Sequence, residues 1–511
     1  MNQYLILPFI VPLFTAILSI IFRKTKLRDY IAVGGSLFYL GAVIALTQAV
    51  IRSGQLVYQA GGWAAPYGIT LTADALSVFM LLMTSIVSLA GVIYSSSYIE
   101  ELGKESGYYA FFHFMLAGMS GAFITGDLFN LFVMFEIVLM SSYAMVSYSG
   151  TDSSLFTSMK YVVLNLIGSS LMLVAIGGLY SVTGTLNMAD LAVVLSSGSV
   201  NTVPVLGLTS VLFCVFAIKS GLVPFHFWAP PVYSESPPPA AAMMAGISKK
   251  VGIYAVIRLY ITIFSTVKIP QTAVLFADNP LTTVIGGLIA VMASATIILG
   301  GTSAVNRNKL DKMLSYSSIG QVGFIFIPIA ITMFTGSKTA LLASLIYILG
   351  HGVAKSSLFM ISGMIQKIAG TTDLEELGGL SEKSFLISAS YFIAAFSLVG
   401  IPPLVGFFAK FMVFKTAVSY GSLGLVAVLL FGALTTLLYF GKSWLKAFFG
   451  EPVELDLSEV TRREPLSVVF LTSVILLLGV GFEPVYQLAE RAAAAALDSQ
   501  GYIDTVLGDK Q

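Results

Sequence analysis

Apolar runs of about 20 residues recur along the whole chain, and each is long enough to cross a lipid bilayer as a helix. Of the 511 residues, 57% are hydrophobic and 10% are charged, whereas soluble domains carry about 25% charged residues. A chain so poor in charge cannot cover a water-soluble surface. Because a bilayer offers the backbone no hydrogen-bond partners, the runs must form helices. We therefore expect an all-α, polytopic membrane protein with about fourteen transmembrane helices.

The expected helices follow one another with short connections. They occupy residues 4–22, 30–50, 76–97, 109–126, 128–149, 160–182, 204–227, 238–264, 282–301, 310–334, 339–366, 385–414, 419–441 and 465–490. The longest connection, GKSWLKAFFGEPVELDLSEVTRR, is too short for a soluble domain, and we expect a surface helix there. The first run has no basic segment before it, so we expect a retained span rather than a cleaved signal.

The sequence contains no motif for nucleotide or redox chemistry. It has no GxxxxGK[ST] loop and no dinucleotide fingerprint in a strand–turn–helix setting. The single cysteine, Cys214, excludes a disulfide and leaves no ligand set for an iron–sulfur cluster. We expect neither a cofactor nor a metal site, which argues against ATP hydrolysis and hydride transfer within this chain.

Basic residues divide unequally between the two sides of the expected membrane protein. With the first loop, RKTKLR, in the cytoplasm, that side holds fifteen cations: Arg23, Lys24, Lys26, Arg28, Lys104, Lys160, Arg307, Lys309, Lys312, Lys367, Lys383, Lys442, Lys446, Arg462 and Arg463. The opposite side holds six: Arg52, Lys268, Lys338, Lys415, Arg491 and Lys510. Because cytoplasmic loops carry the excess of Lys and Arg, we expect both chain termini on the outer face.

Ionisable residues also lie inside the expected spans, where they are rare and usually face the bundle interior or water. Glu136 is about 12 Å from the outer start of its helix, and Lys250 is about 18 Å from the inner start of its own. For these two and Lys219 we favour a function over extension to the headgroups. Arg258, near an outer helix end, is expected to extend to the headgroups. His113 is left open between a satisfied core histidine and a functional group.

The remaining internal cations extend this set across the membrane plane. His351 and Lys355 form an i,i+4 pair on one helix face. Lys249 and Lys250 point about 100° apart, so they cannot share a face, and we expect Lys249 to lie off the common one. The expected chain of titratable groups is Glu136, Lys219, Lys250, His351, Lys355 and Lys410. Glu136 and Lys219 are opposite in sign, and we expect them in direct contact or one water apart.

Prolines interrupt two of the expected helices beside these lysines. Pro224 follows Lys219, while Pro402 and Pro403 precede Lys410. A proline inside a helix frees a carbonyl, which a bilayer tolerates only where protein or water meets it. Paired breaks in two halves of a chain indicate a transport site. Lys410 lies beyond its break, so we expect it to be the group nearest the outer aqueous phase.

The chain also shows signs of an internal repeat. GSSLMLVAIGGL resembles KSSLFMISGMI at an offset of 187 residues, and the two lysines beside the breaks are 191 residues apart. Five spans separate the equivalent segments, an odd number, so the repeats are expected to be inverted. The expected organisation is residues 1–108 for helices 1–3, 109–264 and 282–441 for two five-helix repeats (helices 4–8 and 9–13, with helices 7 and 12 broken), and 442–511 for the C-terminal part.

Several segments resemble the antiporter-like subunits shared by respiratory complex I and the multisubunit Mrp cation/proton antiporters. They are NLFVMFEIVLMSSYAMV, AIKSGLVPFHFWAPPVYSESPPPAAAMMAGISKKVGIYAVIR, DKMLSYSSIGQVGFI, HGVAKSSLFMISG and DLEELGGLSEK. Together they span nearly the whole chain. The triple proline, the lysine rather than glutamate in helix 12 and the ending YIDTVLG most resemble the MrpD group within this family.

The resemblance implies a fourteen-helix fold with inverted repeats and a proton-conducting role. The family's proton-path positions then match Glu136, Lys219, Lys250, His351 with Lys355, and Lys410, with Lys250 preferred over Lys249. The resemblance further implies a sodium/proton antiporter of several different subunits in a bacterial or archaeal cell membrane, which exchanges external protons for internal sodium and serves pH and sodium homeostasis.

Two other functions remain open. One is a proton-pumping subunit of a redox complex, either complex I (an NADH:quinone oxidoreductase) or a membrane-bound hydrogenase. The other is a structural membrane scaffold, which leaves the buried acid and cations unexplained. We favour the antiporter, a secondary active transporter rather than an enzyme. Neighbouring subunits distinguish the first two functions, since iron–sulfur and flavin partners indicate a redox complex.

Overall fold

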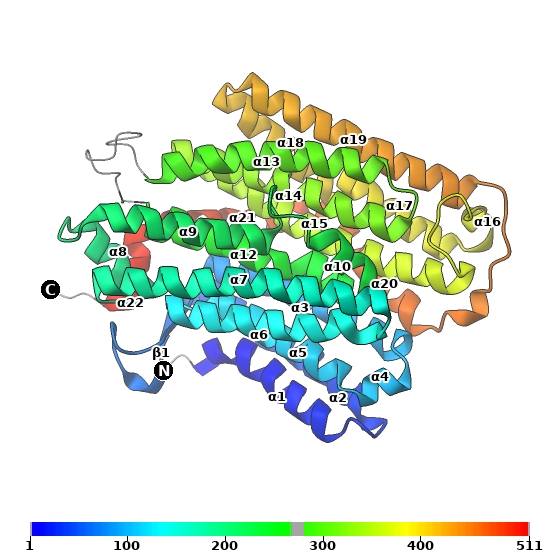
Figure 1. Ribbon diagram of the computed structural model, residues 1–511, viewed down its shortest axis with the longest axis horizontal. Helices are drawn as coiled ribbons and strands as arrows, with labels where there is room; N and C mark the ends of the chain where they lie inside the picture. Colours follow the sequence, from blue (N-terminus) through cyan, green and yellow to red (C-terminus); the bar gives the residue numbers. More distant parts are fainter. Residues whose placement is uncertain (1–2, 266, 268–280, 509–511) are drawn as a thin grey trace.

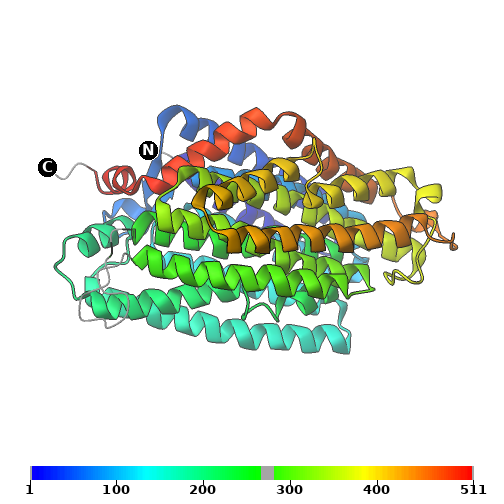
Figure 2. The same ribbon diagram turned by 90° about the horizontal axis from the view of Figure 1, so that it is seen from above.

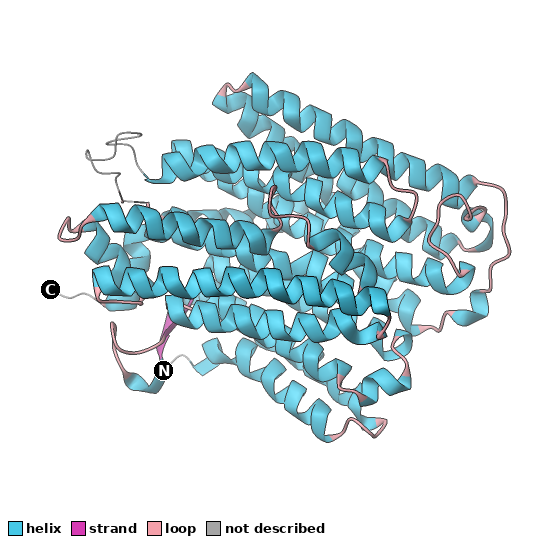
Figure 3. Cartoon of the chain, viewed as in Figure 1, coloured by secondary structure: helices cyan, strands magenta, loops and turns pink. Residues whose placement is uncertain are grey.

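The structure is a computed structural model that describes residues 3–265, 267 and 281–508. Long helices run side by side along the longest axis of the molecule in two perpendicular views (Figure 1; Figure 2). Short strands lie near the end where the N-terminus is found (Figure 3). Of the cations used above to assign the two sides, Lys268 and Lys510 lie outside the described residues.

The elements of the first half follow in this order. They are η1 (Gln3–Ile6), α1 (Leu7–Ile21), α2 (Leu27–Ser53), β1 (Leu56–Gln59), η2 (Ala60–Gly62), β2 (Thr70–Ala73), α3 (Ala75–Tyr98), α4 (Glu101–Glu105), α5 (Tyr108–Ile124), α6 (Leu128–Val146), η3 (Ser147–Ser149), α7 (Asp152–Thr183), α8 (Met188–Ser196), α9 (Thr202–Ser220), α10 (Ala229–Glu235), α11 (Pro238–Met243), η4 (Met244–Ser248), α12 (Lys249–Val256) and η5 (Ile257–Ile263). Strands β1 and β2 pair antiparallel, with Leu56 opposite Ala73.

The second half contains helices only, among the residues that the structure describes. They are α13 (Leu281–Val305), α14 (Leu310–Thr335), α15 (Lys338–Ala369), α16 (Leu380–Lys383), α17 (Phe385–Val399), α18 (Val405–Tyr420), α19 (Leu423–Phe449), η6 (Leu457–Glu459), α20 (Arg463–Val480), α21 (Phe482–Leu497) and α22 (Ser499–Leu507).

Each expected span coincides with helical structure. Twelve described helices are long and apolar enough to cross a membrane, and two shorter apolar helices, α5 and α17, occupy the expected span 4 and the first part of span 12, which α18 completes. The prediction of a polytopic all-α membrane protein is therefore confirmed. The most enclosed spans are the one from α11 to η5, α14 and α15, so the helices that carry Lys249, Lys250, His351 and Lys355 form the centre of the bundle.

The structure corrects three boundaries near the C-terminus. Helix α19 continues to Phe449, so the connection after it contains only the short 3-10 helix η6, and the expected domain boundary at 441/442 falls inside a helix. The last expected span, 465–490, is divided at Gly481 into α20 and α21. The sequence stays largely apolar at the end of α19 and across Gly481, so hydropathy alone does not locate these two helix ends.

The connections gather at two opposite ends of the bundle. Both termini, β1 and α8 lie at one end, while α4 and α16 lie at the other (Figure 1). The loops assigned above to the basic side, including those after α1 and α13, belong to the end with α4 and α16. The excess of Lys and Arg expected for one side of the membrane therefore lies at the end of the bundle with α4 and α16. We call the basic end the inner end.

Both expected helix breaks coincide with non-helical backbone whose polar groups are satisfied. Helix α9 ends at Ser220, and Gly221 follows with a left-handed φ of 72°. Across this break, which contains Pro224, Trp228 Nε1 donates to Ile218 O at 2.9 Å and Val223 N donates to Thr296 Oγ1 at 3.0 Å. Side chains thus meet backbone groups that the break leaves free, as a membrane interior requires.

The second break separates α17 from α18 and has the same plan. Gly400 follows α17 with a left-handed φ of 97°, and Pro402 and Pro403 lie in the connection. On the far side of the break, Gly406 N donates to Ser397 Oγ at 3.3 Å. Each break therefore begins with a glycine in a conformation that other residues rarely adopt, and proline follows within a few residues.

Candidate functional site

Glu136 and Lys219 are joined by a serine rather than by direct contact. Ser169 of α7 donates its hydroxyl hydrogen to Glu136 Oε1. Lys219 Nζ donates to the same Ser169 Oγ at 3.3 Å. Because one hydroxyl accepts from the lysine and donates to the carboxylate, the three groups form a continuous hydrogen-bonded path from α9 through α7 to α6. The two charges are therefore linked through Ser169, and not by the direct contact or single water that we expected.

Glu136 is less enclosed than its place in the sequence suggests. Lys219 is 5% exposed, whereas Glu136 is half-buried and lines a groove with Phe111, Phe132 and Met140 at the side of the bundle. The expectation of a deeply internal acid is wrong in this respect, because α6 lies at the flank rather than at the centre. The acid is thus the outermost member of the group, and Lys219 connects it to the interior.

The helix that carries Lys250 is packed unusually close to its neighbours. Two π-helical segments, η4 and η5, flank α12, and π-helical turns often occur at functional sites. A Cβ added to Gly246 would lie 2.0 Å from Ser356 Oγ of α15, and one added to Gly252 would lie 2.6 Å from Ser220 Oγ of α9. Glycine at both positions lets this helix approach α9 on one side and α15 on the other.

Lys250 connects this helix to His351. Its Nζ donates to Ala245 O at 3.0 Å and lies 2.9 Å from His351 Nδ1, which must accept because an ammonium has only donors. Both side chains are at most 1% exposed. The pairing of Lys250 with His351 is therefore direct. No hydrogen bond joins Lys219 to Lys250 among the described residues, although Gly252 brings their helices together.

Lys355 lies one turn beyond His351 and bonds to α14. Its Nζ donates to Leu314 O at 3.0 Å and to Ser317 Oγ at 2.8 Å. Ser317 in turn donates to Tyr439 OH at 2.8 Å, and Gln321 Nε2 donates to the same phenol oxygen at 3.0 Å. Tyr347 donates to the Gln321 carbonyl oxygen. Lys355 is thus the start of a polar network that leads through α14 and α19 to Tyr347 of α15.

Lys410 lies beside the second break. Its Nζ donates to Val399 O, the last carbonyl of α17, at 3.2 Å, and lies 5.0 Å from the centre of the Phe324 ring. A cation is favoured at the carboxyl end of a helix, and the break exposes such an end inside the bundle. The centre of the Phe324 ring is 5.5 Å from that of Tyr347, onto which it stacks. Lys410 therefore lies next to the far end of the network that begins at Lys355.

A small cavity separates His351 from the helix of Lys410. It has a volume of about 10 Å³ and is lined by Tyr347, His351, Ser397 and Ala409, among others. That is close to the space that one water molecule needs. His351 Nε2 is buried and has no hydrogen-bond partner among the described residues. The six groups expected from the sequence thus form a row that is buried except at Glu136. Among the described residues, no hydrogen bond joins Lys219 to Lys250, His351 to Lys355 or His351 to Lys410.

Lys249 does not lie apart from this row. It points away from Lys250, as two adjacent helical residues must, but it is only 2% exposed. Its Nζ donates to Ser318 O at 3.0 Å and also to Ser318 Oγ. Ser318 directly follows Ser317, the partner of Lys355. Lys249 therefore points to another side of α12 than Lys250 does, but that side is buried as well, because α14 brings a second hydroxyl to it.

The expectation for Arg258 is wrong. Its side chain does not extend to the headgroups but is 1% exposed and pairs with Asp74, whose Oδ2 lies 2.7 Å from Nη2. Asp74 accepts from Ser77 N as the N-cap of α3, and this places a carboxylate at the outer end of the neighbouring helix. No local spacing relates residues so far apart in the chain. Arg258 is thus part of a buried ion pair near the outer end.

His113, which the sequence left open, is a satisfied core histidine. Its Nδ1 lies 2.8 Å from Tyr109 O and its Nε2 lies 3.2 Å from Ser36 Oγ. A carbonyl only accepts, so Nδ1 carries the hydrogen and Nε2 accepts from the serine. Both ring nitrogens are occupied, and none of the described hydrogen bonds connects this ring to the row of lysines.

Sequence reasoning missed the hydroxyl groups that join the charged ones. Ser169, Ser317 and Ser318 mediate three of the contacts described above, and Gln321 and Tyr439 extend them. The signal was present as polar letters within apolar runs, in GSSL at 168–171 and SYSSIGQ at 315–321. Serine in a membrane helix frequently bonds its own backbone, so its type alone did not distinguish these positions.

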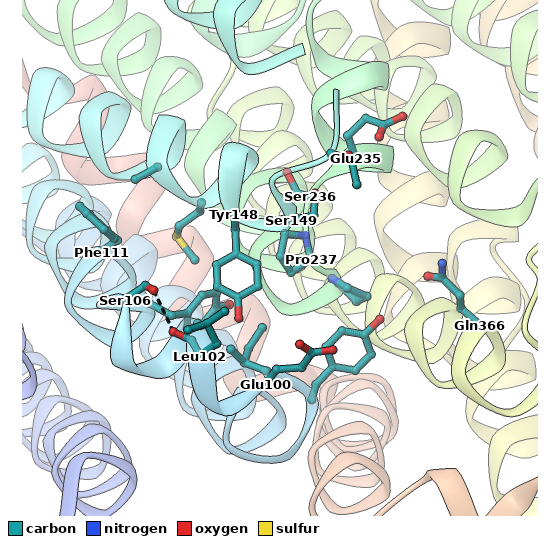
Figure 4. Close-up of a pocket in the computed structure, with 18 of the residues that line it drawn as sticks. Glu100, Leu102, Ser106, Phe111, Tyr148, Ser149, Glu235, Ser236, Pro237 and Gln366 are labelled. Carbon is teal, nitrogen blue, oxygen red and sulfur yellow. Dashed lines mark hydrogen bonds between the residues drawn. The ribbon is translucent and has the colours of Figure 1, made fainter. Parts of the chain in front are cut away.

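The inner end carries two adjoining cavities. The larger, of about 630 Å³, is lined by Glu100, Ser106, Tyr148, Ser236 and other residues. Glu235 and Gln366 lie on the opposite side of it from Leu102 and Ser106, with Ser236 and Pro237 between (Figure 4). The second cavity, of about 200 Å³, shares Glu235, Ser236 and Gln366 with the first. The segment that follows the first helix break thus forms a wall common to both.

Comparison with known proteins agrees with this arrangement. The family model described as "NADH:quinone oxidoreductase/Mrp antiporter, TM" matches residues 125–436, which include every member of the row. A second model, "NADH-Ubiquinone oxidoreductase (complex I), chain 5 N-terminus", matches residues 63–112. The chain belongs to the NADH:quinone oxidoreductase/Mrp antiporter family.

Relatives within this antiporter family match the chain from end to end. A Na(+)/H(+) antiporter subunit of Alkalihalophilus pseudofirmus is 36% identical, covering 99% of this chain and 100% of the relative. A chain in the Mrp complex of Dietzia sp. has a TM-score of 0.89 at 28% identity, over 99% of this chain and 100% of that one. A chain of an archaeal membrane-bound sulfane sulfur reductase has a TM-score of 0.90, also at 28% identity and with the same coverage. The fold is therefore that of the Mrp antiporter family and its respiratory relatives.

Proposed function

We propose that this chain is the proton-translocating subunit of a multisubunit Na⁺/H⁺ antiporter. The observation that carries the proposal is the row that leads from the half-buried Glu136 through Ser169 and Lys219 to the buried Lys410. Ionisable groups inside a membrane protein are costly unless they serve transport or each other, and a proton needs such groups to cross apolar interior. The relative named as a Na(+)/H(+) antiporter subunit supports sodium as the exchanged cation.

We also propose a lateral route for the proton. Protons pass between Lys410 and the His351/Lys355 pair, then Lys250, then Lys219 and Glu136. During sodium export, uptake from the outside begins at Lys410, which lies beyond the second break in α18, the outer part of the interrupted helix. The two breaks support inverted five-helix repeats, 109–264 and 282–441, because each has a lysine beside it. Lys219 is in the last turn of α9, and Lys410 of α18 bonds to the last carbonyl of α17.

The antiporter acts as part of a larger assembly in the cell membrane. The row of groups provides a route for the proton only. Other subunits provide the path for the cation. The solved Mrp complex that contains a chain of the same fold supports different subunits as the partners. The proposed activity is coupled ion transport rather than catalysis of a covalent reaction.

The orientation of the chain has its own test. We propose that the inner end faces the cytoplasm and that both termini face outward. Single cysteines at residues 23–29 and 306–312, made in a Cys214→Ser background, should react with an impermeant thiol reagent only in inside-out vesicles. Labelling of the same cysteines in intact cells would reverse the orientation.

One observation favours a second function. The similarity to a chain of a sulfane sulfur reductase, described as an archaeal respiratory membrane complex, fits a proton-pumping subunit driven by electron transfer. Purification of the assembly from its membrane separates the two functions. Copurifying small membrane subunits without redox centres, with sodium-driven pH change in vesicles, are expected for the antiporter. Copurifying iron–sulfur or flavin subunits would support the redox complex instead.

A further inference from the structure

Lys249 is the one lysine at the centre of the bundle that the row of groups leaves unused, among the described residues. It lies about 16 Å from the inner start of its helix at Pro238. Its Nζ bonds only to the carbonyl and hydroxyl of Ser318, and it lies 5.3 Å from the centre of the Tyr233 ring. No carboxylate bonds to it among those residues. A buried ammonium held by one serine and a ring is costly if its only role is structural.

The Tyr233 ring separates Lys249 from water at the inner end. Tyr233 is 2% exposed and lines the cavity of about 200 Å³ between α10–α11, the start of α14 and the end of α15. The cavity also touches Glu235, Asp311 and Lys312, all of which are at least partly exposed. The Tyr233 ring thus lines a cavity at the inner end and also lies beside the buried ammonium.

On its other side, Lys249 joins the central groups. Ser318 holds Lys249, and the preceding residue, Ser317, holds Lys355 at 2.8 Å. The neighbour of Lys249 in the chain, Lys250, is bonded to His351, which lies one turn from Lys355 on α15. Two adjacent serines of α14 therefore hold Lys249 of α12 and Lys355 of α15, and Lys250 and His351 lie on the same two helices. The charges have the same sign, so adding a proton to one favours its loss from another.

We propose that Lys249 is the inner end of the proton path, where protons pass between the central groups and the inner aqueous cavity beside Tyr233. This inference rests on the proposed function and adds the side of exit. In the direction of sodium export, the ammonium of Lys249 gives one proton to a water that enters from the cavity past the Tyr233 ring, breaking an N–H bond and forming an O–H bond. The neutral amine then takes one proton from Lys355 or Lys250, so one proton enters and one leaves.

The test compares two replacements of Lys249 that a structural role and a relay role affect differently. Arginine keeps the positive charge but does not release its proton, and methionine removes the charge at similar length. Both Lys249→Arg and Lys249→Met should lower sodium-driven proton flux at least about ten-fold in vesicles with a normally assembled complex. Lys160→Met, which changes an exposed lysine of α7, is the matched control and should keep the wild-type rate.

The outcomes separate this inference from the proposed function. Full flux in Lys249→Arg would show that only the charge matters and would overturn the relay. If the wild-type complex exchanges protons for sodium and Lys410→Ala stops the exchange, the proposed function stands whatever the result for the Lys249 variants. Accessibility gives a second measurement that needs no active variant. Ala241→Cys, in the wall of the cavity and in a Cys214→Ser background, should react with a small charged thiol reagent from the inner side, and failure to react would also overturn the proposal.

Discussion

Replacing Glu136 by glutamine is expected to lower sodium-driven proton flux at least about ten-fold. The carboxylate is the sole negative charge that the described residues bring to Lys219, through Ser169. Removing one member of a buried pair leaves an uncompensated charge at a cost on the order of 3–5 kcal/mol, and less here because Glu136 is half-buried. The measurement is the rate of sodium-driven pH change in vesicles from cells without a native antiporter.

Ser169 gives this prediction an internal control. Ser169→Ala removes the bridging hydroxyl and should also slow proton flux, whereas Ser169→Thr retains a hydroxyl and should keep most of it. Glu490→Gln changes a partly exposed acid of α21 that pairs with Lys338, and it should leave proton flux at the wild-type rate. If Glu136→Gln transports normally in an assembled complex, the acid has no part in the path. If Ser169→Ala is normal while Glu136→Gln is not, a water replaces the serine.

Replacing Lys410 by alanine is expected to remove proton-coupled transport without preventing assembly. The side chain bonds to the carbonyl of Val399 at the end of α17, and the adjoining Phe324 and Tyr347 link it to the network of Lys355. Without the amine no titratable group remains at that break among the described residues. A carboxylate also relays protons, so Lys410→Glu should retain part of the flux.

The matched control lies on the same helix. Lys415 is exposed on α18, a little more than one turn beyond Lys410, and Lys415→Ala should transport like the wild type. Assembly is checked by native gel for all three variants. Wild-type flux in Lys410→Ala would eliminate the proposed entry point and with it the lateral route.

Hydropathy and charge predicted most of the fold and the ionisable members of the site. Each apolar run became a helix because the backbone has no other way to satisfy its hydrogen bonds in a bilayer. The lysines were recognisable because a charge in such a run is rare. Proline near Lys219 and Lys410 indicated the breaks, and the structure has non-helical backbone at both places.

What the sequence could not predict depended on contacts between distant helices. Asp74 and Arg258 form an ion pair although they are 184 residues apart in the chain, and no local sequence spacing predicts such a pair. Nothing in the local sequence distinguishes Ser169 and Ser318 from other serines in membrane helices. Their role depends on a lysine that bonds to each of them from another helix. Helical geometry alone predicts that Lys249 points away from the face of Lys250 and takes no part in the row. Its burial depends on α14, which supplies a partner on the side away from Lys250.

We propose that protons move along the row from Glu136 to Lys410 in exchange for sodium, and this exchange can be measured directly. The experiment uses the purified complex sealed in vesicles with a pH-sensitive dye, a sodium gradient and no electron donor. We predict a proton flux opposite to the sodium flux, lost in Glu136→Gln and in Lys410→Ala and retained in Lys415→Ala. Proton movement that requires an electron donor and ignores sodium, or full exchange in both end variants, would contradict the proposal.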